Sequence, residues 1–175
     1  MSKIKNDLTQ KFSKTTIVTH WLTALLILIL FPMGKYMEGL ELSEKMGLIK
    51  IHAALGILVL ILTIIRTISF FKHERPADIK TGSKLNDKLA VWIHNIFYLL
   101  LFGLAISGLV TMIIGGYGEA LKTGNIDAVI SLSEIPSLKP HGTMAVIMIV
   151  LLIMHILGFL KHWIFKKENT LKRIT

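Results

Sequence analysis

The chain carries the apolar stretch IHAALGILVLILTIIRTISFF at residues 51–71. A helix of this length crosses the hydrocarbon core of a bilayer, which is about 30 Å thick. Three more runs share this character and the required length of roughly 17–25 residues, and they lack the alternating pattern of barrel strands. The four runs are Ile17–Met33, Ile51–Phe71, Ala90–Ile114 and Thr143–Phe165. The sequence therefore predicts an all-α membrane protein, a four-transmembrane-helix bundle.

The composition of the 175 residues excludes several other classes of protein. Hydrophobic residues make up 53% of the chain and charged residues 18%, whereas a soluble domain has about 45–50% and about 25%. This excess argues against a soluble domain, a disordered chain and a nucleic-acid-binding module. The absence of cysteine excludes disulfides, thiolate zinc sites, iron–sulfur clusters and covalently attached c-type haem. We find no internal repeat, so a single transmembrane domain covering residues 1–175 is expected.

The positive charges predict how the chain crosses the membrane. Lys and Arg residues concentrate in the N-terminal tail, the second connection and the C-terminal tail: Lys3, Lys5, Lys11, Lys14, Arg66, Lys72, Arg75, Lys80, Lys84, Lys88, Lys161, Lys166, Lys167, Lys172 and Arg173. The first and third connections hold only Lys35, Lys45, Lys50, Lys122 and Lys139. By the positive-inside rule, both termini face the cytoplasm.

The first run could also be a secretory signal, because lysines precede it. It is long for the apolar region of a signal peptide, and no small-x-small cleavage site follows residues 31–35. We therefore interpret it as a span. Pro76, Gly82 and Ser83 indicate an exposed cytoplasmic loop, whereas Gly115 to Pro140 reads as a long outer loop after the third helix.

Histidines are the most informative residues, because ionisable side chains inside a bilayer are costly and suggest a function. Six of the seven lie in the spans or at their ends: His20, His52, His94, His141, His155 and His162. Each one alone could be a hydrogen-bonded helix histidine, but their joint placement favours a shared role. His73, in the basic loop, reads as a solvated side chain.

The histidines fall at two depths. His52 begins the second helix and His141 the fourth, so both are expected near the outer surface, whereas His20 and His155 belong to the inner half. His141 and His155 share one face of the fourth helix, about 21 Å apart along its axis. Such stacking suits two haems, each held by two axial imidazoles, whereas zinc or copper requires three or four converging ligands. The expected pairs are His52 with His141 and His20 with His155.

Other residues are consistent with a bound cofactor but have simpler explanations. Gly56, Gly103, Gly108 and Gly158 could leave room for a flat macrocycle, or could let helices pack closely. Arg66 lies at the inner depth, where it could neutralise a haem propionate or snorkel to the surface. Lys50 and Lys139 each precede an outer histidine by two residues and could neutralise outer propionates.

The sequence resembles the prokaryotic cytochrome b561 family over essentially its whole length. The matching stretches are Thr19-His20-Trp21, Ile51-His52 through Arg66, Ile93-His94 through Gly108-Leu109-Val110, Pro140-His141, Met154-His155, His162-Trp163 and Lys167-Glu168-Asn169-Thr170-Leu171. The resemblance implies a multi-pass protein of the bacterial cytoplasmic (inner) membrane that binds two non-covalent b-type haems and exchanges electrons with ubiquinone or another quinone.

The resemblance also implies roles for individual residues. The family's axial iron ligands fall on His20, His52, His141 and His155. Some members are similar to superoxide oxidases, an oxidoreductase activity in which superoxide outside reduces ubiquinone, and this implies that His162 and Trp163 line a quinone pocket. His94 is open: it could compete as an inner ligand, bind a propionate or handle protons. The loop from Gly115 to Pro140 departs most from the family pattern, and it would shape the site of the outer donor.

The sequence suggests three hypotheses for the function. The leading hypothesis is electron transfer from an outer donor, possibly superoxide steered by Lys50 and Lys139, to a quinone that takes a proton from His162. Against the steering, the first connection is neutral overall and the third is slightly acidic. In the second hypothesis the chain is a cytochrome b subunit that accepts electrons from a partner dehydrogenase or hydrogenase. The third, a metal or proton transporter, is disfavoured because we find no repeat and no proline inside a span, Pro32 being expected near the end of the first helix.

Overall fold

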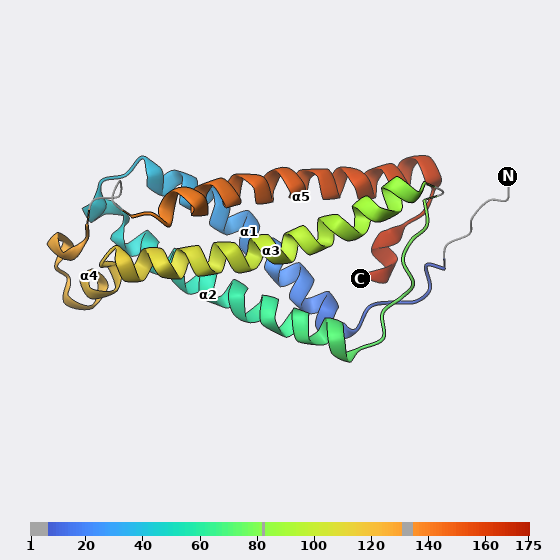
Figure 1. Ribbon diagram of the computed structural model, residues 1–175, viewed down its shortest axis with the longest axis horizontal. Helices are drawn as coiled ribbons and strands as arrows, with labels where there is room; N and C mark the ends of the chain where they lie inside the picture. Colours follow the sequence, from blue (N-terminus) through green and yellow to red (C-terminus); the bar gives the residue numbers. More distant parts are fainter. Residues whose placement is uncertain (1–6, 82, 131–134) are drawn as a thin grey trace.

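The computed structural model describes residues 7–81, 83–130 and 135–175. Across these residues the regular secondary structure is entirely helical, and four of the helices are long and apolar enough to cross a membrane. They are α1 (Lys14–Glu38), α2 (Leu42–Lys72), α3 (Lys84–Ile114) and α5 (Leu138–Lys166) (Figure 1). Short helical segments complete the chain: α4 (Tyr117–Thr123), η1 (Ile126–Ala128) and η3 (Thr170–Arg173). The predicted all-α, four-helix membrane architecture is confirmed.

The helices pack chiefly as α1 against α2 and α3 against α5, with α2 and α3 joining the two pairs. Figure 1 shows both termini and the connection between α2 and α3 at one end of the bundle, which we call the termini end. The opposite end, which we call the α4 end, holds α4 and the turn between α1 and α2. Toward the termini end the α1–α2 pair diverges from the α3–α5 pair. Lys3, Lys5, Gly82 and the Lys166 side chain lie outside the described part of the chain.

The buried core is small and lies at mid-height. Its members come from all four long helices: Leu26, Leu30, Val59, Leu62, Leu100, Leu101 and Met148. Many other large apolar side chains are exposed, including Leu99, Ile113 and Phe165, which is 80% exposed. In a bilayer, lipid tails cover such side chains, so a core this small suffices for a membrane bundle.

Helix α2 begins earlier than expected, at Leu42, and the reason is a capping interaction. The Glu41 and Glu44 side chains each accept a hydrogen bond from the backbone of the other residue, which is the arrangement of a capping box. The signal was missed because glutamate stands where serine or threonine is usual. The prediction that His52 begins the second helix was therefore wrong: His52 lies about three turns into α2.

Lys45 is another residue whose surroundings the sequence did not reveal. Its side chain is buried, and its Nζ donates to the Leu40 carbonyl at 2.9 Å and to the Met37 carbonyl at 3.5 Å. These carbonyls belong to the end of α1 and the turn after it, where backbone acceptors lack helical partners. Lys45 therefore joins the end of α1 to the start of α2.

Pro32 also lies differently from the prediction. Helix α1 continues past it to Glu38, so the proline is inside the helix rather than near its end. Proline removes one backbone donor and disturbs the preceding turn. The expectation of no proline within a span interior was therefore wrong for α1.

The third connection contains more structure than the predicted loop from Gly115 to Pro140. Helix α3 ends at Ile114 as expected, but α4 and η1 follow it, and α5 already begins at Leu138. The segment folds back on itself because the Ile130 backbone N–H donates to the Gly115 carbonyl at 3.2 Å. This reversal requires a left-handed backbone conformation, which Gly116 adopts with a φ of 72°.

Replacement of Gly116 by alanine should destabilise the protein. An alanine here would be strained by about 1–3 kcal/mol, and its Cβ would lie 2.2 Å from the Ala128 carbonyl oxygen. Thermal unfolding in detergent, followed by circular dichroism, measures the effect. Gly118→Ala is the matched control, because a Cβ there meets no described atom within 4 Å. Equal melting temperatures for the two variants would contradict the prediction.

Candidate cofactor site

At the α4 end, His52 of α2 and His141 of α5 lie close together. Their ring centroids are 6.2 Å apart, and the ring planes meet at 65°. Both side chains are partly buried. The neighbouring helices approach the rings closely: a Cβ added to Gly34 would lie 3.5 Å from Cε1 of His52, and one on Gly108 would lie 3.3 Å from Cε1 of His141. Helices α1 and α3 therefore pack against the two imidazoles.

The two rings of this pair have different hydrogen-bond environments. Nδ1 of His141 lies 2.9 Å from the Ser107 hydroxyl, which itself donates to the Leu104 carbonyl at 3.1 Å. Nδ1 of His52 is buried and has no hydrogen-bond partner among the described residues. One ring is thus held by α3, whereas the other keeps an unsatisfied buried nitrogen.

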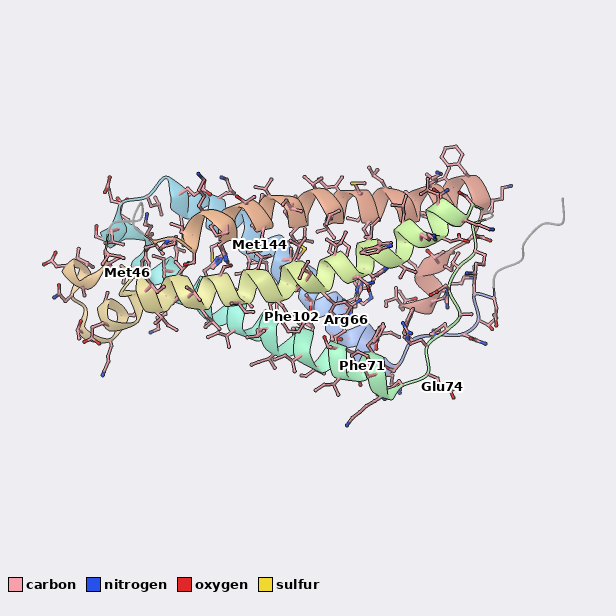
Figure 2. All side chains as sticks on the ribbon, viewed as in Figure 1. Met46, Arg66, Phe71, Glu74, Phe102 and Met144 are labelled. Carbon is pink, nitrogen blue, oxygen red and sulfur yellow. The ribbon has the colours of Figure 1, made fainter. Side chains whose placement is uncertain are left out.

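Toward the termini end, a second group of histidines surrounds a cavity of about 70 Å³. Its polar lining includes His20 of α1, Arg66 of α2, His94 of α3 and His155 of α5. The His94 and His155 rings are perpendicular, with centroids 5.4 Å apart. Figure 2 shows Arg66 in this half of the bundle. All four long helices therefore contribute to this second level.

At this level two buried nitrogen atoms have no hydrogen-bond partner among the described residues, whereas one histidine ring is held by a backbone carbonyl. Nδ1 of His20 and Nε of Arg66 are buried without a hydrogen-bond partner among the described residues. The Arg66 guanidinium lies 5.5 Å from the centre of the Tyr98 ring, a distance that allows a cation–π contact. Nδ1 of the exposed His94 is 2.7 Å from the Ala90 carbonyl, so Nδ1 carries the proton that it donates and Nε2 keeps its lone pair.

We expected four glycines either to leave room for a macrocycle or to allow close helix packing, and they differ in whether an added Cβ would meet a neighbouring helix. A Cβ on Gly103 would lie 2.8 Å from Sδ of Met144, which Figure 2 places between α3 and α5. Gly103 therefore allows these helices to pack closely, as Gly108 does beside His141. A Cβ on Gly56 or Gly158 would meet no described atom within 4 Å, so close helix packing does not account for these two glycines.

The remaining expected site residues lie at the ends of the bundle. Lys50 and Lys139 are exposed at the α4 end. At the other end, Nδ1 of His162 lies 3.3 Å from a carboxylate oxygen of Glu168, and both side chains are about one-fifth exposed. Trp163 is half exposed and stacks on Phe159, with ring centroids 5.8 Å apart. The structure does not bring His162 into the cavity beside His155.

Sequence reasoning missed several residues that contact the histidines. Ser107 holds His141, and Phe97 lies edge-on to His155 at 5.6 Å. Trp21, whose ring is 5.4 Å from that of His20, donates through Nε1 to the Ile174 carbonyl at 2.8 Å and so joins α1 to the C-terminal segment. Serine, phenylalanine and tryptophan are ordinary in membrane helices, so no signal in the sequence marked these contacts.

The arrangement fits a metal-containing macrocycle better than a metal ion held by protein alone. No group of three or more metal-ligating side chains converges within the described residues. Two imidazoles that bind one metal at about 2 Å from each nitrogen have ring centroids about 6 Å apart, which matches the 6.2 Å between His52 and His141. The unsatisfied Nδ1 atoms of His20 and His52 leave buried imidazoles available. The cavity itself is smaller than a typical ligand pocket of about 300 Å³, so a bound macrocycle would extend beyond it between the helices.

Comparison with known proteins finds matches over most of the chain. The family model described as prokaryotic cytochrome b561 matches residues 11–175. Cytochrome b561 homolog 2 of Escherichia coli (strain K12) is 26% identical over 173 residues, covering 94% of this chain and 91% of the relative. Cytochrome b561 homolog 1 of the same organism is 28% identical over 171 residues, covering 94% and 96%.

Proposed function

Because the chain belongs to the prokaryotic cytochrome b561 family, and is therefore a membrane electron-transfer cytochrome with b-type haem, we propose that it binds two haems and moves electrons across the bacterial cytoplasmic membrane to quinone. The observation that carries this proposal is the placement of histidines at two levels of one bundle, separated by the apolar core. A single level of histidines would hold only one haem.

At the α4 end, His52 and His141 would hold one haem through their imidazoles. At the other level, His20 and His155 would hold the second, and His94 is the competing ligand because its Nε2 keeps a lone pair. Bound haem supplies one-electron transfer, which no side chain here provides by itself. The protein holds the two groups at fixed depths and excludes water from the space between them, where Leu26, Leu62 and the rest of the core lie.

Arg66 would pair with a propionate of the haem at the termini end. Its buried guanidinium has an unsatisfied Nε, and it lies beside the same cavity as His20 and His155. A buried charge is costly without an opposite charge, and a carboxylate is the group that arginine binds best. The contact with Tyr98 keeps the guanidinium in the membrane interior rather than at the surface.

The α4 end would face outward, since the positive residues concentrate at the other end. Superoxide is the donor that we favour there. Each superoxide anion would give up one electron and leave as dioxygen, and two such electrons with two protons convert a quinone to a quinol. Lys50 and Lys139, both exposed near the outer pair, would attract the anion.

Quinone would bind at the termini end, close to His162 and Trp163. The exposed face of Trp163 offers an aromatic surface to a quinone ring, and the lipid-facing position suits a ligand that enters from the bilayer. His162 would deliver a proton to the reduced quinone. A carboxylate oxygen of Glu168, 3.3 Å from Nδ1 of His162, can hold the ring and orient its other nitrogen.

Counting haems in histidine variants tests the proposal directly. Purified protein should contain two haems per chain with the visible spectrum of low-spin b-type cytochromes. Alanine at His52 or at His141 should remove the same haem, and alanine at His20 or at His155 should remove the other. His73→Ala is the matched control, because His73 is exposed at the end of α2.

His94→Ala decides the pairing at the termini end. If His20 and His155 are the ligands, this variant keeps both haems. A His52 or His141 variant that retains two haems per folded chain would contradict the proposed outer pair, and a protein without haem would contradict the whole proposal.

Replacement of Arg66 by methionine should have opposite effects on haem-free and haem-loaded protein. Without haem, the change removes a buried charge and should raise the melting temperature. With haem, it should leave a propionate unpaired and destabilise the protein by about 3–5 kcal/mol. Thermal unfolding of both forms measures the sign, with Lys72→Met, at the end of α2, as the control. A lower melting temperature in both forms would argue against the pairing.

Neutralising the two outer lysines tests the donor. Lys50→Gln with Lys139→Gln should lower the rate of superoxide-driven haem reduction about tenfold at low salt, and the difference should shrink as salt screens the field. Stopped-flow spectroscopy measures the rate, and Lys122→Gln, exposed on α4, is the control. Unchanged rates would remove superoxide steering from the proposal.

Full quinone reduction by the isolated chain would disfavour the alternative of a subunit that needs a dehydrogenase or hydrogenase partner.

A further inference from the structure

We propose that Ser107 is a positioning residue that fixes the orientation and protonation of the His141 ring and thereby lowers the reduction potential of the outer haem. This inference rests on the proposed function, in which His141 is an axial ligand. It assigns a role to a side chain that binds neither haem nor substrate itself.

The direction of the hydrogen bonds determines the protonation of His141. A serine hydroxyl has one hydrogen, and that of Ser107 is donated to the Leu104 carbonyl at 3.1 Å. In the proposed arrangement the Ser107 oxygen accepts at its other contact, the one with Nδ1 of His141 at 2.9 Å. Nδ1 thus carries the proton, and Nε2 keeps the lone pair that an iron requires.

The surroundings of Ser107 make this contact rigid. The side chain is buried at 9% exposure, so little water competes for its oxygen. Its backbone carbonyl accepts a hydrogen bond from the Thr111 hydroxyl at 2.8 Å, which continues to the Ser137 hydroxyl at 2.7 Å. Ser137 directly precedes α5, so a chain of hydroxyls joins α3 to the start of the helix that carries His141.

The other proposed ligand of the outer haem lacks this support. Nδ1 of His52 is buried without a hydrogen-bond partner in the described part of the chain, as is Nδ1 of His20 at the inner level. A neutral imidazole whose N–H is hydrogen-bonded becomes a stronger electron donor to its metal. A stronger donor favours ferric over ferrous iron and lowers the potential. Ser107 should therefore act on the outer haem and leave the inner haem unchanged.

Redox titration of Ser107→Ala tests the inference in purified, haem-loaded protein. We expect the reduction potential of one haem to rise by at least about 28 mV, which is a threefold change in its ferrous-to-ferric ratio for one electron. The potential of the other haem should stay at its wild-type value. The variant removes the only hydroxyl that the described residues place against Nδ1 of His141. Ser107→Thr, which keeps the hydroxyl, should restore the wild-type potential. Thr143→Ala is the control, since it removes an exposed hydroxyl of α5 that donates to the Lys139 carbonyl instead.

The outcomes separate this inference from the proposed function. If His141→Ala keeps both haems, His141 is no ligand and the proposed function fails at the outer site. If His141→Ala loses one haem but Ser107→Ala keeps both wild-type potentials, the inference is overturned and the proposed function stands. Loss of the outer haem from Ser107→Ala, with full haem content in Ser107→Thr and Thr143→Ala, would support the positioning role. An equal shift in Ser107→Thr and Ser107→Ala would contradict it.

Discussion

The structure depends on the need of each imidazole inside a bilayer for a partner. Water cannot solvate these nitrogens, so each must meet a protein group or a bound ligand. At the α4 end His52 and His141 lie at a centroid distance of 6.2 Å, on helices that belong to different packed pairs, and Nδ1 of His52 has no protein partner among the described residues. A ligand bound between them would join the α1–α2 pair to the α3–α5 pair, a connection that the small apolar core makes only in part.

The fold separates two tasks along its length. The mid-height core keeps the two histidine levels apart and gives each a dry surrounding. The levels themselves are polar and incompletely satisfied, with unpartnered atoms on His20, His52 and Arg66. This pattern is expected of a protein completed by its cofactor, because buried polar groups are otherwise paired. At the α4 end, by contrast, the Lys45 side chain is paired with a backbone carbonyl after α1, and Gly116 turns the chain into α4.

Most of the architecture could be predicted from the sequence, and the failures have physical causes. Length and hydropathy predicted the four spans because a bilayer permits only helices there. The start of α2 was missed because its cap uses Glu41, and the extent of α1 because the helix continues past Pro32. The third connection appeared as a loop because short helices such as α4 carry little periodicity.

Which residues share a depth follows from the sequence alone, since each helical residue advances about 1.5 Å along the axis. This spacing places His141 and His155 at different levels of one face. The tertiary packing selects which side chains of other helices meet them. That choice depends on how each helix is rotated and tilted against its neighbours, which residue spacing does not specify. Thus His94 as well as His20 reaches the cavity beside His155, and Ser107 rather than any charged residue holds His141.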